Sequence, residues 1–168
     1  MEKSKQEQYE QYDESEWDKI IFNSVTNSYI VVHKQHGQRE RDGNLQIAHR
    51  LLLLGYSVEL LPIIENEKTP DSRLNDTLWE FKMTSGSISS IQSRLREGKE
   101  QCPRILLALP ERFILGDILR GIISAINADK NGKIEIIGLL IDHELVEMKR
   151  IDIEKRRFTK LNQYLSTP

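Results

Sequence analysis

The sequence predicts an α/β protein in which a mixed β-sheet is flanked by helices. Segments rich in β-branched and aromatic residues alternate along the chain with segments whose apolar residues recur at helical spacing. Two extended segments are separated only by Asn75-Asp76, which predicts a β-hairpin. The later strands alternate with helices, which is typical of crossover connections between parallel strands. A hairpin followed by crossover units gives a sheet with both parallel and antiparallel pairs.

The length and charge of the chain suit one domain with distinct ends. At 168 residues the chain has the usual size of a single domain. Its net charge is only −2, so no overall basic field predicts a nucleic-acid partner. Acids dominate one end and basic residues the other. We expect an acidic, partly helical N-terminal segment (1–27), a central α/β domain (28–150) and a basic C-terminal helix or tail (151–168).

The cysteine content and the hydropathy predict a reduced, cytoplasmic protein. Cys102 is the single cysteine, so neither a disulfide framework nor a cysteine metal site is expected. The chain opens on a polar stretch and not on a basic patch followed by an apolar run. No segment approaches the roughly 18–20 apolar residues of a membrane span. We therefore expect no membrane association.

The N-terminal elements are predicted from spacing and composition. Trp17, Ile20, Ile21 and Val25 recur at helical spacing, so a helix is expected there. The sequence SYIVVH at 28–33 is rich in β-branched and aromatic residues and predicts a short strand.

The middle of the chain predicts a helix and three extended segments. A polar loop precedes a helix at 44–54, which Gly55 closes. A strand at 56–61 ends at a proline. The extended runs 70–74 and 77–83 form the arms of the predicted hairpin.

The second half predicts alternating helices and strands. A Ser-Gly-Ser sequence precedes a helix at 88–98, and a buried strand follows at 104–109. The apolar helix at 114–128 leads to the last clear strand, 133–141. A basic helix is expected at 153–165. In order this gives α–β–β–β–α–β–α–β after the N-terminal segment.

The register of the hairpin brings charged residues together. A two-residue turn pairs Leu74 with Thr77, which places Asp71 directly opposite Glu80. Glu80 and Lys82 share one face of their strand because side chains alternate. Opposite carboxylates, with Cβ atoms about 4.5–5.5 Å apart, repel each other unless a cation neutralises them. Oxygen ligands suit Mg²⁺ or Mn²⁺, and the lysine can align an attacking water, so the pattern predicts metal-assisted hydrolysis.

The same residues resemble a known nuclease motif. Pro-Asp at 70–71, eight further residues and Glu-Phe-Lys at 80–82 resemble the PD-(D/E)XK motif, and the surrounding order α-β-β-β-α-β is similar to that superfamily's restriction-endonuclease-like core. Over 44–109 the pattern LLLLGYSVELLP…PDSRLNDTLWEFKMTSGSISSIQSRLREGKEQ also resembles the C-terminal tRNase toxin domains of contact-dependent growth-inhibition (CdiA) proteins.

The resemblance implies an activity and a set of site residues. It implies a metal-dependent endonuclease that acts on RNA, most closely tRNA, with Mg²⁺ or Mn²⁺ and with Zn²⁺ as an alternative. Asp71 and Glu80 would be the metal ligands, Lys82 the catalytic lysine and Gln101 an accessory catalytic position. An immunity protein would be a further partner.

One ligand of the motif is left open by the sequence. Many of these nucleases carry another acid on the first helix of the core, and the predicted helix at 44–54 has none. Glu40, Asp42 and Glu59 are the candidates, and the sequence does not choose among them.

Other interpretations of these residues remain. Glu80 and Lys82 can be charged residues on a solvated hairpin face, while Trp79 and Phe81 are expected in the core either way. The chain can also be a DNA endonuclease of a phage or mobile element, or a non-catalytic module that binds nucleic acid or protein on a decayed nuclease fold. The basic C-terminal segment is a candidate nucleic-acid contact.

The histidines carry no motif. A surface position is expected for His33 and His36, and the edge of the core for His49.

Overall fold

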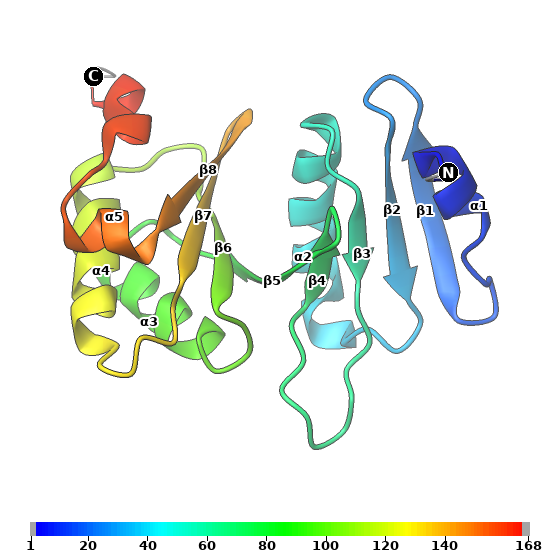
Figure 1. Ribbon diagram of the computed structural model, residues 1–168, viewed down its shortest axis with the longest axis horizontal. Helices are drawn as coiled ribbons and strands as arrows, with labels where there is room; N and C mark the ends of the chain where they lie inside the picture. The colour runs from blue at the N-terminus through cyan, green and yellow to red at the C-terminus, as the bar shows by residue number, and fades with distance from the viewer. Residues whose placement is uncertain (1–2, 166–168) are drawn as a thin grey trace. The chain divides into compact units, whose positions relative to one another are not determined.

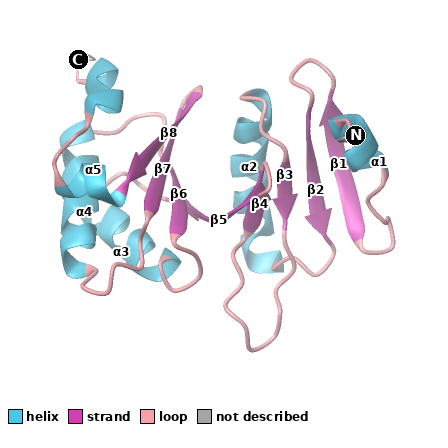
Figure 2. Cartoon of the chain, in the orientation of Figure 1, coloured by secondary structure: helices cyan, strands magenta, loops and turns pink. Residues whose placement is uncertain are grey.

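The computed structural model describes residues 3–165 of the chain. The first two residues of the predicted N-terminal segment and the last three of the predicted C-terminal segment lie outside this range. Within it, the strands form an eight-stranded mixed sheet in the order β1 to β8, with helices beside it (Figures 1 and 2). This confirms the predicted α/β class. The contacts divide the chain into two compact units, 1–79 and 80–168, and the boundary falls inside β5.

The first unit consists of the first four strands, the beginning of β5 and two helices. Its elements are α1 (Lys5–Glu10), β1 (Trp17–Asn23), β2 (Ser28–His33), α2 (Gln38–Leu53), β3 (Val58–Leu60), β4 (Ser72–Leu74) and β5 (Thr77–Met83). The β2–β3 pair is parallel, and the β1–β2, β3–β4 and β4–β5 pairs are antiparallel.

The two helices of this unit cover opposite faces of β2. Tyr29 points to α1, where it contacts the ring of Tyr9, with ring centroids 5.7 Å apart. The neighbouring Ser28 points the other way and donates to a carbonyl of α2, at Leu52 (3.1 Å). Successive side chains of a strand alternate between its faces, which explains why β2 is buried along almost its whole length.

Two elements of the first unit differ from the sequence predictions. The helix expected at 17–25 is wrong, because Trp17–Asn23 is a strand. A register shift between Lys19 and Ile21 interrupts the alternation of side chains and hides the strand pattern in the sequence. The second helix begins at Gln38 and not at 44. The earlier start was missed because the first turns are polar and exposed and the N-cap, Gly37, makes no side-chain hydrogen bond.

The second unit contains the end of β5, three further strands and the remaining helices. They are α3 (Ile88–Gly98), β6 (Arg104–Ala108), α4 (Leu115–Ala128), β7 (Ile136–Ile141), β8 (Glu144–Lys149), α5 (Arg150–Glu154) and the 3₁₀ helix η1 (Thr159–Tyr164). Strands β5, β6 and β7 are parallel, and β8 is antiparallel to β7. Helices α3 and α4 pack on each other and on one sheet face, in a core that includes Ile91, Ile105, Leu107, Ile122, Ile137 and Leu139.

The second unit agrees with most sequence predictions and departs from two. Helix α3 has the predicted bounds, and the hydroxyl of Ser87 caps it by accepting from the N–H of Ser90 (3.2 Å). The prediction that 133–141 contains the last strand is wrong, because β8 follows after a tight turn at Asp142 (φ 39°). The single helix expected at 153–165 is also wrong. Arg156 adopts a left-handed conformation (φ 56°), which separates α5 from η1.

Within residues 3–165, no helix combines the length and the apolar character needed to cross a membrane.

Candidate functional site

The hairpin of β4 and β5 has the predicted register. Asn75 and Asp76 both have positive φ (43° and 68°), as a type I′ turn requires. Across this turn Leu74 pairs with Thr77, and the ladder continues from there through two more pairs, Arg73 with Leu78 and Ser72 with Trp79. Asp71 directly precedes this ladder in the sequence and Glu80 directly follows it. The predicted pairing is confirmed as far as the ladder extends.

Glu80 and Lys82 form a buried ion pair. The Nζ of Lys82 lies 2.7 Å from an Oε1 oxygen of Glu80, and their side chains are 15% and 3% exposed. Both belong to β5, two residues apart, so they project from the same face as predicted. The interpretation of these residues as a solvated hairpin face is therefore wrong. A carboxylate buried to this degree requires a charged or hydrogen-bonding partner, and Lys82 is one.

The pair lies on the sheet face that α3 and α4 cover. In the parallel ladder Glu80 is the partner of Ile105, and Lys82 is the partner of Leu107. Ile105 and Leu107 both belong to the core beneath these helices, and register partners project from the same face of the sheet. On the opposite face of β5, Phe81 is 2% exposed, as expected of a core residue. Trp79 is likewise buried.

Two residues that sequence reasoning missed lie within electrostatic reach of this pair. Burial raises the pKa of the Cys102 thiol, and the negative charge of Glu80 acts in the same direction. Burial also disfavours the charged form of Glu97, but hydrogen bonds from Ser93 and Arg94 and the charge of Lys82 outweigh it and lower the pKa of Glu97. Neither residue belongs to the hairpin, so only the packing of α3 on the sheet places them here.

Asp71 is buried and its backbone is fixed by β3. The residue as a whole is only 9% exposed. The N–H of Leu61 donates to the carbonyl of Asp71 (2.9 Å), which extends the β3–β4 ladder by one step. Pro70 precedes it and restricts the chain on the other side.

The accessory position and the alternative acids lie in different surroundings. Gln101 is exposed in the turn after α3, and its N–H donates to the carbonyl of Gly98 (2.9 Å). Its accessory role stays a prediction. Glu40 and Asp42, which the sequence placed in a loop, lie on α2 and are exposed.

Glu59 has an ionic partner of its own. Its Oε2 lies 2.6 Å from Nη1 of Arg73, its register partner on β4. Burial raises the pKa of Tyr12, and a hydrogen bond with Glu59 raises it further. A role of Glu59 as the third acidic ligand stays a prediction.

A metal held without a substrate requires a group of side chains arranged to hold it. Among residues 3–165, no group of three or more His, Cys, Asp or Glu side chains is arranged to hold a metal. Mg²⁺ is commonly held by one or two carboxylates, with water and substrate phosphates in the remaining positions. Zn²⁺ sites use three or four protein ligands. Binding of Mg²⁺, Mn²⁺ or Zn²⁺ by the two predicted acids stays a prediction.

The histidines differ from the sequence predictions. His36 is 3% exposed, so the surface position expected for it is wrong. His33 is half-buried and packs edge-on against the ring of Trp17, with centroids 4.9 Å apart. His49, expected at the edge of the core, is exposed on α2.

The basic C-terminal segment presents several exposed cations. Lys155, Arg156, Arg157 and Lys160 are exposed, and the last donates to the carbonyl of Glu147 (2.9 Å). Contact of this segment with nucleic acid stays a prediction.

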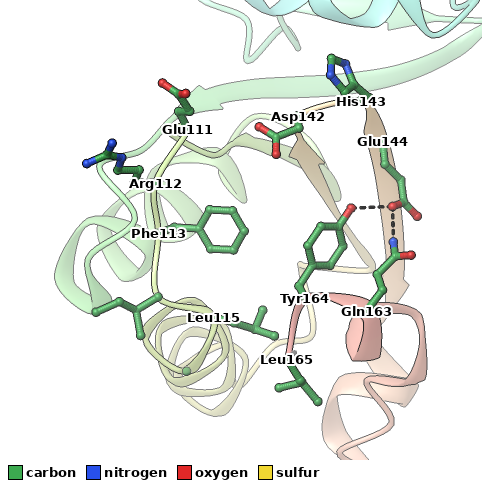
Figure 3. A pocket seen from close by; sticks show the side chains of 12 residues that line it. Glu111, Arg112, Phe113, Leu115, Asp142, His143, Glu144, Gln163, Tyr164 and Leu165 are labelled. Carbon is green, nitrogen blue, oxygen red and sulfur yellow. Dashed lines mark hydrogen bonds between the residues drawn. The ribbon is translucent and has the colours of Figure 1, made fainter. Parts of the chain in front are cut away.

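A pocket of about 1080 Å³ lies elsewhere in the second unit (Figure 3). The loop before α4, the β7–β8 turn and η1 surround it, and Phe113 and Tyr164 face each other across it. The hydroxyl of Tyr164 donates to Glu144 (2.5 Å); burial and this carboxylate raise the pKa of Tyr164 to about 12. Neither Glu80 nor Lys82 lines this pocket.

Comparison with known proteins gives one weak structural likeness. No model of a known family and no curated protein matches the sequence. The chain is similar to a chain in a solved structure described as a CdiA-CT/CdiI toxin and immunity complex from Burkholderia pseudomallei, with 16% identity and a TM-score of 0.48. The similarity covers 73% of this chain and 98% of the other. A likeness at this level identifies neither a family nor an activity.

Proposed function

We propose that this protein is a metal-dependent endonuclease of the PD-(D/E)XK type that hydrolyses phosphodiester bonds, with RNA, and tRNA in particular, as its substrate. The observation that carries the proposal is the buried Glu80–Lys82 pair at 2.7 Å. It lies on the strand that the motif requires, and the hairpin before it has the register that predicts Asp71 opposite Glu80.

The buried carboxylates are the chemical basis of the proposal. In it, Asp71 and Glu80 hold Mg²⁺ or Mn²⁺, which would stabilise negative charge on the phosphate and lower the pKa of a bound water. Buried acids attract a cation more strongly than exposed ones because the effective dielectric constant around them is lower.

Lys82 has a separate role. Its ammonium donates toward Glu80 and can also donate to an attacking water or to a phosphate oxygen. We expect it to orient the nucleophile and to balance the charge that develops on the phosphate. Loss of Lys82 should therefore affect turnover more than metal binding.

The choice of RNA rests on the sequence resemblance to the CdiA tRNase toxin domains. Within this proposal an immunity protein is a partner, because toxins of that kind are neutralised in the cell that makes them. The exposed cations at 155–160 supply charge for contacts with phosphates.

The proposal is tested by incubating the purified full chain with total tRNA and, separately, with supercoiled plasmid DNA. Each substrate is assayed with Mg²⁺, Mn²⁺, Zn²⁺ or EDTA. We expect cleavage of tRNA with Mg²⁺ or Mn²⁺ and none with EDTA. Cleavage of the plasmid alone would make the protein a DNA endonuclease. No cleavage of either substrate, with no binding of Mn²⁺ by calorimetry, would show a non-catalytic module.

A further inference from the structure

A buried histidine supports the strand end next to Asp71. His36 lies in the turn between β2 and α2, and its Nδ1 is 2.6 Å from the carbonyl oxygen of Leu61. Leu61 in turn donates its N–H to the carbonyl of Asp71 (2.9 Å). One backbone residue therefore links the imidazole to the chain at Asp71. All three residues belong to the first unit.

The contacts of His36 define its tautomer. A carbonyl oxygen can only accept, so Nδ1 carries the hydrogen and donates to Leu61. Nε2 of the neutral ring is then an acceptor, and the side-chain amide nitrogen of Asn44 lies 3.1 Å from it. Asn44 is on α2 and is 5% exposed. Both ring nitrogens are thus satisfied inside the protein.

The surroundings favour this neutral form. Burial lowers the pKa of His36, although the hydrogen bond to Leu61 and the charge of Glu40 oppose the shift. Arg41 and His33 add to the lowering.

The location of this contact gives it a consequence for the site. Residues 63–68, in the loop between β3 and Asp71, are exposed. The loop closes where Leu61 meets Asp71, and there the N–H of Ile63 also donates to the carbonyl of Gln35 (3.1 Å). The turn that contains His36 is therefore hydrogen-bonded to the first residues of an exposed loop, and Asp71 lies at the other end of that loop.

We infer that His36, oriented by Asn44, is a positioning residue that fixes the backbone of Asp71 through Leu61 and so sets the metal affinity of the site. The inference rests on the proposed function, because it takes Asp71 as a metal ligand. Groups that orient metal ligands typically change metal affinity by 10–100-fold when they are removed.

The test measures binding of Mn²⁺ alone to the full chain by calorimetry. His36→Asn keeps an amide donor near the position of Nδ1, whereas His36→Leu removes both ring nitrogens. We expect His36→Leu to weaken Mn²⁺ binding roughly tenfold and His36→Asn to restore most of the affinity. In cleavage assays the metal concentration for half-maximal rate should rise in the same order, while the rate at saturating metal changes little. His49→Leu, on the exposed part of α2, is the matched control and should bind as the wild type does.

The outcomes separate the inference from the proposed function. If the wild type binds Mn²⁺ and folded His36→Leu binds it equally well, the positioning role is wrong and the metal site stands. If the wild type does not bind Mn²⁺, the metal site itself is wrong. Should His36→Leu fail to fold, His36→Gln replaces it, because its longer side chain places the amide near Nε2 and away from Leu61. Equal Mn²⁺ affinity of His36→Gln and His36→Asn would then overturn the inference.

Discussion

Replacing Lys82 by methionine tests whether the ion pair of the site is buried. The substitution keeps the unbranched side chain up to the position of Cε and removes the charge 2.7 Å from Glu80. Removal of one partner of a buried pair costs about 3–5 kcal/mol, against about 0–1 kcal/mol for a surface pair. Because Lys82 is 15% exposed, we expect a loss near the lower end, about 3 kcal/mol. For a chain of this size that loss lowers Tm by roughly 6–12 °C.

The assay is urea unfolding followed by circular dichroism, in EDTA so that no divalent cation replaces the lost charge. The double variant Glu80→Gln/Lys82→Met should be more stable than Lys82→Met, because a neutral amide replaces the buried carboxylate that has lost the charge of the lysine. Lys133→Met is the matched control. Lys133 pairs with Glu100 at 2.8 Å, but both side chains are about 40% exposed, so its loss should cost less than about 1 kcal/mol. Equal losses for Lys82→Met and Lys133→Met would show that the Glu80–Lys82 pair is no more buried than the surface pair.

Three further predictions concern stability, pH and charge. Burial disfavours ionised Asp129, but hydrogen bonds from a backbone N–H and two cations outweigh burial and lower its pKa. Ionised Asp129 therefore stabilises the fold at neutral pH, and this stabilisation is lost as pH falls through the lowered pKa. Asp129→Asn should destabilise the protein at pH 7 and flatten the acid side of its curve of unfolding free energy against pH. The pKa of His36 is lowered from 6.5, so on acidification this histidine is protonated in the unfolded chain before it is protonated in the folded one. The free energy of unfolding should therefore fall as pH drops below about 6.5. Urea titrations at several pH values should show a smaller fall for His36→Asn. Replacing Arg156, Arg157 and Lys160 together by alanine should reduce the salt dependence of RNA binding by roughly one unit of slope per lost phosphate contact, and an unchanged slope would assign the segment to solvent or packing.

Local signals in the sequence were sufficient for the hairpin and for one helix. The Asn75-Asp76 turn determines which residues pair across β4 and β5, since a two-residue loop leaves one register. The alternation of side chains then places Glu80 and Lys82 on one face, where the structure shows them in contact. The cap at Ser87 likewise marks the start of α3.

Features that depend on tertiary packing could not be predicted. The bulge after Lys19 interrupts the alternation of side chains in β1, so the apolar residues of this strand recur at helical spacing in the sequence. The burial of His36 depends on a carbonyl 25 residues further along the chain, which no local pattern indicates. Glu97 and Cys102 come within reach of the site only because α3 packs on the sheet.

If Glu80 holds the metal that cleavage requires, Glu80→Gln should abolish metal-dependent cleavage. The variant is assayed on whichever of tRNA or plasmid DNA the wild type cleaves, at saturating Mg²⁺ and at a temperature where circular dichroism shows it folded. Glu147→Gln, at an exposed position on β8, is the matched control. We predict that Glu80→Gln cleaves no faster than the wild type does in EDTA, while Glu147→Gln keeps the wild-type rate. Wild-type cleavage by Glu80→Gln would show that the active site lies elsewhere.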